Sequence, residues 1–189
     1  MLGFIDVLFA NTLFALLSLS VLFFSVFVIV ANVAGRVSGA RWAVQVQDAV
    51  SAQAAPLVFA VTGSAMLGSL YYSQVVGYPP CTLCWYQRIA IYSLAIISLV
   101  ATVRRTPGTL RPYGLTLAAV GLPISIYHTW LQAYPRVTSF CSADAPCSER
   151  HVWEFGFVSI PFMAFTVLLF TIVVLSTRKK GLPDGRRPA

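Results

Sequence analysis

The chain has 189 residues, of which 58% are apolar and 10% are charged, whereas soluble domains carry about 25% charged residues. This composition excludes a disordered protein, a nucleic-acid-binding arm and an ordinary soluble enzyme. The formal net charge is +7, from 13 basic and 6 acidic residues. The basic residues fall between long uncharged stretches, which is typical of a polytopic membrane protein whose loops carry its charge.

The uncharged stretches predict an all-α protein with five membrane-spanning helices, because one span needs about 20 apolar residues. The stretch between Asp48 and Arg88 is too long for a single span. Pro56 and the Gly-Tyr-Pro-Pro sequence at 77–80 bound one helix within it. The expected spans are residues 12–34, 55–76, 84–103, 112–134 and 155–177.

The distribution of Lys and Arg predicts which connections face the cytoplasm. With five spans, the connections 35–54 and 104–111 and the tail share one side and carry ten of the 13 basic residues. The opposite side receives the N-terminus and the connections 77–83 and 135–154, with four of the six acidic residues. We therefore expect the N-terminus outside the cell membrane and the C-terminus in the cytoplasm.

The first apolar stretch also has to be compared with a cleaved signal peptide. It lacks a basic amino-terminal region, exceeds the usual length of about 7–15 residues, and is followed only by a weak cleavage site, Ala-Asn-Val-Ala at 31–34. We expect this stretch to be retained as a membrane-spanning helix.

Four cysteines lie at the outer surface in this topology, on the side where disulfides persist. Their spacing favours the pairs Cys81–Cys84 and Cys141–Cys147. A Cys-x-x-Cys ring constrains too few residues to stabilise a fold much, so redox exchange explains the first pair better than a structural staple does. Zinc binding is the other alternative, but the wider spacing of the second pair matches zinc sites poorly. We expect thiol–disulfide exchange and no metal.

The residues around Cys84 favour a reactive thiol. Pro79 and Pro80 discourage helix before the motif, so a helix begins close to Cys84, and a helix N-terminus stabilises a thiolate. Arg88 lies four residues further on, on the same helix face and about 6 Å along the axis. An arginine within the membrane boundary is a functional candidate, and the alternative is a side chain that extends to the lipid headgroups.

His128 is the second polar side chain expected within the membrane. It lies about six residues before Pro135, so roughly 9 Å below the outer end of its span. This depth is comparable to that of Arg88. A lone helical histidine is more often a hydrogen-bonded core residue, so both interpretations remain open at this point.

Four sequence segments carry a resemblance to a known family: CTLCWYQR at 81–88, YHTWLQAYP at 127–135, ER at 149–150 and EFGFVSIP at 154–161. Together with the second cysteine pair, they resemble the disulfide bond formation protein B (DsbB) family over about residues 55–177. The short second cysteine loop is similar to the compact, BdbC-like branch of that family.

The resemblance implies a protein-dithiol:quinone oxidoreductase, built as a four-helix membrane bundle in the bacterial cell membrane. Its partner would be a thioredoxin-like (DsbA-like) thiol oxidase outside the cytoplasm. Electrons would pass from this partner to Cys141–Cys147, then to Cys81–Cys84, and then to ubiquinone or menaquinone in the bilayer. Cys141 would form the mixed disulfide with the partner and Cys147 would close its own pair, although the short loop allows these two roles to be exchanged.

The resemblance also implies roles near the cofactor. Cys84 would be the sulfur nearest the quinone, with Cys81 as its disulfide partner. Arg88 would stabilise negative charge on the quinone and on the Cys84 thiolate, and His128 would lie near the quinone ring.

The helix over residues 12–34 lies outside the family core. We expect residues 1–54 to hold this helix and a cytoplasmic connection, residues 55–177 to form the oxidase bundle, and residues 178–189 to form a basic cytoplasmic tail. One alternative is a structural or receptor-like membrane protein with two stapled loops. A nearer one is a vitamin K epoxide reductase-like oxidase, which the position of Cys-x-x-Cys at the start of a helix disfavours.

Overall fold

The computed structural model describes residues 2–134, 141 and 146–178. Within this part of the chain, every regular element is helical, apart from one isolated bridge between Glu154 and Val158. The helices are α1 (Leu2–Val37), α2 (Arg41–Ala52), α3 (Ala54–Leu70), a π-helical turn η1 (Tyr71–Val75), α4 (Thr82–Val103), α5 (Pro107–Ala133) and α6 (Ile160–Ser176).

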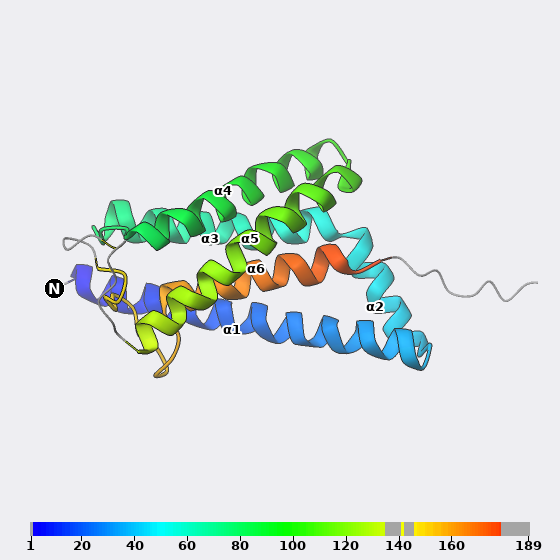
Figure 1. Ribbon diagram of the computed structural model, residues 1–189, viewed down its shortest axis with the longest axis horizontal. Coiled ribbons are helices and arrows are strands. Elements are labelled where there is room, and N and C mark those ends of the chain that lie inside the picture. Colours follow the sequence, from blue (N-terminus) through cyan, green and yellow to red (C-terminus); the bar gives the residue numbers. More distant parts are fainter. Residues whose placement is uncertain (1, 135–140, 142–145, 179–189) are drawn as a thin grey trace, which may run out of the picture.

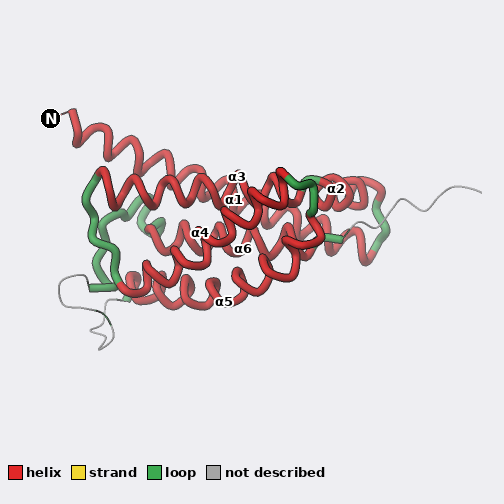
Figure 2. Tube along the Cα trace, turned by 90° about the horizontal axis from the view of Figure 1, so that it is seen from above, coloured by secondary structure: helices red, strands yellow, loops and turns green. Residues whose placement is uncertain are grey.

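Helices α3 to α6 form a bundle in which each helix packs against the next, and α3 also contacts α6 (Figures 1 and 2). Helix α1 packs along α6, and the short α2 connects α1 to α3. Among the described residues, four helices are long and apolar enough to span a membrane, and the 17-residue α6 is a shorter apolar helix. The fold is therefore a polytopic membrane bundle of four helices with one additional N-terminal helix, as the sequence predicts.

Helix boundaries differ from the expected spans where turns compete with apolar sequence. Helix α6 begins at Ile160 instead of at residue 155, because Phe155 and Gly156 both adopt positive φ angles and form a tight turn. Helix α5 has Pro107 in its first turn, where the N–H that proline lacks would have no helical partner. The helix therefore starts five residues before Pro112, where the expected span begins.

The connection between the first two spans also forms a helix, α2, which is fixed against the end of α1. The side-chain amide of Gln47 donates hydrogen bonds to the carbonyls of Ala31 and Asn32, at 3.2 and 3.3 Å. Gly35 leaves room for this amide, because an added Cβ there would collide with it. Helices α1 and α2 therefore pack as a close pair.

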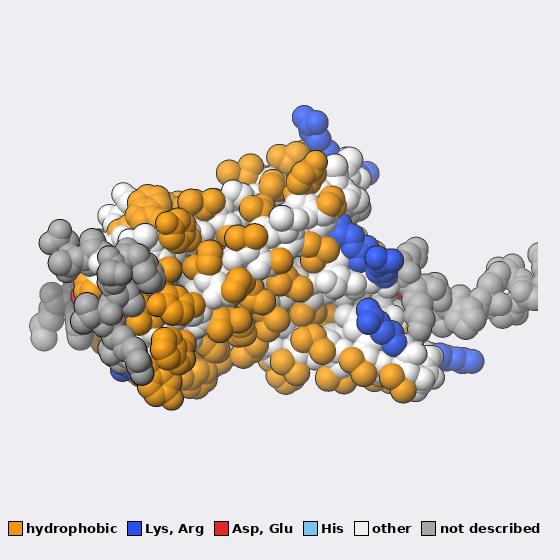
Figure 3. Space-filling model, in the orientation of Figure 1, with side chains coloured by type: hydrophobic (Ala, Val, Ile, Leu, Met, Phe, Trp, Pro, Cys, Tyr) orange, Lys and Arg blue, Asp and Glu red, His pale blue; other side chains and the backbone are white. Residues whose placement is uncertain are grey.

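Charged side chains separate along the bundle axis. On the face shown in Figure 3, Lys and Arg gather at one end, and hydrophobic side chains cover the middle. This basic end contains Arg36 in the last turn of α1 and Arg104 at the end of α4. Cys81 and Cys84 lie at the opposite end of α4, so the cysteine motif and the basic cluster occupy opposite ends of the bundle.

Candidate redox site

The Cys-x-x-Cys motif forms the N-terminus of α4. Cys81 is the N-cap residue, in an extended conformation after Pro79 and Pro80, and its Sγ accepts a hydrogen bond from the backbone N–H of Cys84 at 3.3 Å. Cys84 therefore lies in the first helical turn, as the sequence predicts. The two cysteines carry free thiols with sulfurs 2.7 Å apart, so conversion between dithiol and disulfide needs little movement.

The Cys81 thiol has an environment that favours its ionised form. The hydrogen bond with the Cys84 thiol is the largest influence and, together with a weaker contribution from His128, lowers the pKa of Cys81, although burial acts in the opposite direction.

The second cysteine pair lies against the first. Cys141 and Cys147 form a disulfide with Cα atoms 5.9 Å apart. Cys147 is buried in one apolar cluster with Cys81, and Cys84 and Cys141 pack against this cluster. All four cysteines that the sequence singled out are therefore gathered at one end of the bundle.

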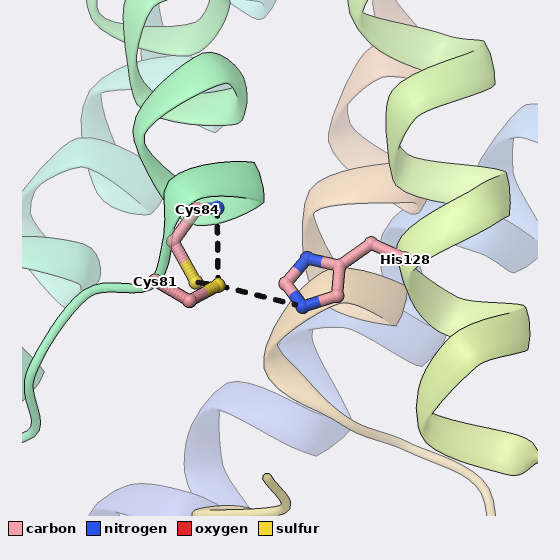
Figure 4. Close-up of side chains that lie close together, drawn as sticks. All are labelled: Cys81, Cys84 and His128. Atoms are coloured by element: carbon pink, nitrogen blue, oxygen red, sulfur yellow. Dashed lines mark hydrogen bonds between the residues drawn. The ribbon is translucent and has the colours of Figure 1, made fainter. Parts of the chain in front are cut away.

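His128 lies between the two cysteine pairs. Its Nε2 is 3.7 Å from Sγ of Cys81 (Figure 4) and 3.0 Å from the backbone carbonyl oxygen of Cys147. Because a carbonyl oxygen only accepts, Nε2 carries a proton in this arrangement. The imidazole is completely buried and links the second loop to the motif on α4.

The segment after Cys147 is anchored to the end of α5. The side-chain amide of Gln132 donates to the carbonyl of Glu149 at 2.6 Å, and Arg150 donates to the carbonyls of Gln132 and Ala133 at 2.6 and 3.1 Å. The two Arg150 contacts satisfy carbonyl groups that the C-terminus of α5 otherwise leaves unpaired. Arg150 was recognised in the sequence only as part of the ER segment at 149–150, and this anchoring role was not predicted.

A cavity of about 370 Å³ lies beside Cys84, between α1, α3, α4 and α6. Cys84 and Arg88 both line it, and most of the other lining residues are apolar. His128 and Cys81 line a much smaller space, of about 20 Å³, which Cys84 and Cys147 also line. The motif thus has two sides: Cys84 borders both spaces and reaches the large cavity, whereas Cys81 lies beside His128 and the second disulfide.

Arg88 lies one turn below Cys84, as its spacing predicts. Its guanidinium donates a hydrogen bond to the carbonyl of Ser69 on α3 at 3.2 Å and lies 5.4 Å from the centroid of the Trp85 ring. The side chain is half-buried and lines the cavity. It therefore places positive charge near the Cys84 sulfur and next to the cavity space.

Comparison with known proteins places these features in a family. The profile described as "Disulfide bond formation protein DsbB" matches residues 51–177. The chain belongs to the DsbB family. A probable disulfide formation protein of Oceanobacillus iheyensis is 41% identical over 122 residues, covering 62% of this chain and 83% of that protein. The disulfide bond formation protein C of Bacillus subtilis is 38% identical over 117 residues, covering 61% of this chain and 84% of that protein. No solved structure matches the chain.

For a DsbB-family bundle, the large cavity has the size and polarity that a quinone needs. Ligand sites commonly enclose about 300–1,000 Å³ and combine apolar walls with a few polar groups. A quinone presents two carbonyl oxygens that only accept hydrogen bonds. Among the described residues that line the cavity, Gln87 and Tyr92 have a buried Nε2 and Oη without a hydrogen-bond partner, so both can donate. A quinone therefore fits the residues present, and neither donor was predicted from the sequence.

The DsbB-family motif also groups three possible metal ligands. Ligand atoms of Cys81, Cys84 and His128 lie within 4.8 Å of one another. Structural zinc sites are almost always completed by four ligands, and this group supplies three from the described residues. Nε2 of His128 lies 3.0 Å from the Cys147 carbonyl oxygen, and this hydrogen bond requires a proton on Nε2. A metal would instead need the lone pair of that nitrogen, so the contact disfavours metal binding through Nε2.

Proposed function

We propose that this protein is a quinone-dependent thiol oxidase, which reoxidises a thioredoxin-like disulfide oxidase outside the cytoplasm. Membership of the DsbB family supports disulfide formation in general. The observation that carries the finer proposal is the two-sided position of the Cys81–Cys84 motif. One side packs with Cys147, and the other lines a cavity that suits a quinone.

The second cysteine pair receives electrons from the partner. Cys141 is partly exposed, whereas Cys147 is only 2% exposed. A thiolate of the partner therefore attacks the Cys141 sulfur and forms a mixed disulfide, and Cys147 leaves. The second partner thiol then displaces Cys141, which yields the oxidised partner and a reduced Cys141/Cys147 pair.

Electrons then pass to the motif on α4. Cys147 attacks Cys81, the motif sulfur in its own cluster, and Cys84 leaves as a thiolate. The helix N-terminus and Arg88 stabilise that leaving thiolate. Cys141 then closes its disulfide with Cys147, which leaves Cys81 and Cys84 reduced. A quinone bound in the cavity would supply the oxidising power, accepting two electrons and two protons as the Cys81–Cys84 disulfide re-forms.

Reconstitution of the full chain tests this function. Purified protein in lipid nanodiscs is mixed with a reduced thioredoxin-like partner and a short-chain ubiquinone or menadione. The loss of quinone absorbance and the loss of partner thiols are measured in parallel. We expect one quinone to be reduced per partner disulfide formed. Two structural staples would give no quinone consumption. A vitamin K epoxide reductase-like enzyme would in addition consume a quinone epoxide, which we do not expect here.

The role of Arg88 predicts a selective defect in the quinone step. Arg88→Ala removes a charge-assisted hydrogen bond, which costs about 1.5–3 kcal/mol, or roughly a ten- to hundredfold loss in rate or affinity. Lysine restores activity only in part, because it lacks the planar fork of arginine. Quinone titrations measure the effect, with Arg104→Ala at the far end of α4 as the control. Unchanged quinone kinetics in Arg88→Ala would contradict this role and favour the alternative, a side chain that extends to the lipid headgroups.

The position of His128 predicts a defect in exchange between the cysteine pairs. His128→Ala removes contacts to Cys147 and Cys81, and we expect partner-driven turnover to fall about tenfold. Quinone reduction driven by dithiothreitol, which reduces Cys81–Cys84 directly, should change less. Thr129→Ala is the matched control on the same helical turn. A larger loss with dithiothreitol than with the partner would instead place His128 at the quinone ring.

The same variant predicts a change with pH. Because the His128 contact helps to lower the pKa of Cys81, its removal raises that pKa. On acidification, the Cys81 thiolate of the variant is therefore protonated at a higher pH than in the wild type. Iodoacetamide labelling of the reduced chain against pH, read by mass spectrometry at Cys81, measures the shift.

Membrane orientation is also part of the proposal. Cysteines that cycle through disulfides must face the oxidising side, and the basic end of the bundle should face the cytoplasm. Reporter fusions after residues 45, 108 and 180 should therefore read cytoplasmic, and fusions near 78 and 143 external. A cytoplasmic reading near 143 would contradict the assignment.

A further inference from the structure

Helix α1 lies outside the family match, which begins at residue 51, yet it forms a wall of the large cavity. Four of its residues, on successive turns of one face, line that space: Phe14, Leu17, Ser18 and Val21. Cys84 and Arg88 on α4 line the same space. The cavity beside the reactive sulfur is therefore built partly by a segment that the family profile does not include.

Specific contacts hold α1 in this position. The hydroxyl of Tyr72 donates a hydrogen bond to the side-chain oxygen of Asn11 at 2.9 Å, and both side chains are buried. The Phe14 ring lies 5.7 Å from the Tyr72 ring, centroid to centroid. An added Cβ on Gly68 would lie 3.0 Å from the Phe14 ring, so this glycine allows α1 to approach α3. Tyr72 and Gly68 themselves line the cavity.

Tyr72 belongs to η1, a π-helical turn at the end of α3. Such turns are rare and occur frequently at functional sites. Here the turn joins α1 to the cavity, because Tyr72 contacts Asn11 and also stacks on Tyr78, with ring centroids 5.9 Å apart. Tyr78 in turn stacks on His151 at 4.5 Å. A buried polar contact within a membrane helix is costly unless it is paired, so the Asn11–Tyr72 bond specifies where α1 docks.

We infer that α1 is part of the quinone-binding site and forms one fixed wall of the cavity that Cys84 and Arg88 also line. This inference rests on the proposed quinone-dependent function. Lipid chains are as apolar as the cavity walls, so a cavity with an open flank would exchange its occupant with lipid. A docked helix replaces that flank with a fixed surface, and the ring then binds between α1 and α4. Residues on the inner face of α1 therefore determine which quinones fit.

A pair of matched substitutions tests this role. Ser18 is buried and lines the cavity, whereas Ser20 lies two residues further along α1 and is exposed. In full-length protein we expect Ser18→Trp to weaken binding of a short-chain ubiquinone or menadione at least about tenfold, because the indole would occupy space that the ring needs. Ser20→Trp should bind like the wild type. Both variants should still pass one disulfide from Cys141–Cys147 to the reduced partner, a step without quinone.

Labelling of the unmodified chain provides a measurement that does not depend on how Ser18→Trp folds. An azido-quinone is photolysed on the wild-type protein, and labelled peptides are identified by mass spectrometry. We expect label on the α1 peptide around residues 11–21 as well as on α4. If both Trp variants bind quinone as tightly as the wild type and the α1 peptide carries no label, the inference is overturned and the proposed function stays intact. A wild-type chain that neither binds nor is labelled by quinone would overturn the proposed function itself.

Discussion

Replacement of Cys84 by Ala is expected to abolish quinone reduction, with a loss of about three orders of magnitude or more. Cys84 is the motif sulfur that lines the large cavity, and the proposed reaction needs its thiolate as a nucleophile. The spectroscopic rate of quinone consumption with a reduced partner measures the effect. Thr82→Ala, inside the same motif, is the matched control and should remain active.

The Cys84→Ala variant should nevertheless keep its first half-reaction. Its Cys141–Cys147 disulfide can oxidise one equivalent of reduced partner, after which turnover stops. Quantifying partner thiols by alkylation distinguishes this single event from general inactivation. Continued multiple turnover in Cys84→Ala would show that Cys84 does not pass electrons to the acceptor.

Replacement of Cys147 by Ala is expected to trap the partner as a stable mixed disulfide. Cys141 is partly exposed, and Cys147 is buried in the Cys81 cluster, so the variant retains the thiol that reaches the partner and loses the one that could release it by attack from within the loop. A partner that keeps only its attacking cysteine is added as its mixed disulfide with thionitrobenzoate, so that Cys141 displaces thionitrobenzoate and forms the complex. Nearly all of this complex should persist on non-reducing gels, because neither Cys147 nor a second partner thiol can release it.

The complementary variant provides the control for this trapping. Cys141→Ala should give little mixed disulfide, because Cys147 is 2% exposed. Efficient trapping in Cys141→Ala but not in Cys147→Ala would exchange the two roles. Trapping on Cys84 would reverse the proposed order of electron transfer.

Helix positions were largely predictable because charges and prolines bound the apolar segments. The expected span 84–103 corresponds to α4 at Thr82–Val103, where Pro79 and Pro80 prevent an earlier start. The start of α6 was not predictable from hydrophobicity, since Phe157 and Val158 are as apolar as the helix itself. Its position depends on the turn at Gly156, with φ of 80°.

The candidate site was predictable in its residue types but only partly in its arrangement. Spacing alone places Arg88 one turn from Cys84, because both lie on one helix. His128 comes from another helix, and its packing against Cys147 depends on how the second loop folds back, which periodicity does not encode. His128 contacts Cys147 and Cys81, and its expected position near a quinone ring stays a prediction. The contribution of α1 to the cavity likewise depends on packing between distant segments.

The redox state of the four cysteines in membranes tests the central claim most directly. Membranes depleted of quinone are incubated with reduced partner, supplemented or not with quinone, and trapped with an alkylating reagent for mass spectrometry. We predict that all four thiols become reduced without quinone, and that quinone restores both Cys81–Cys84 and Cys141–Cys147. Disulfides that respond neither to the partner nor to quinone would contradict the account and leave two structural staples.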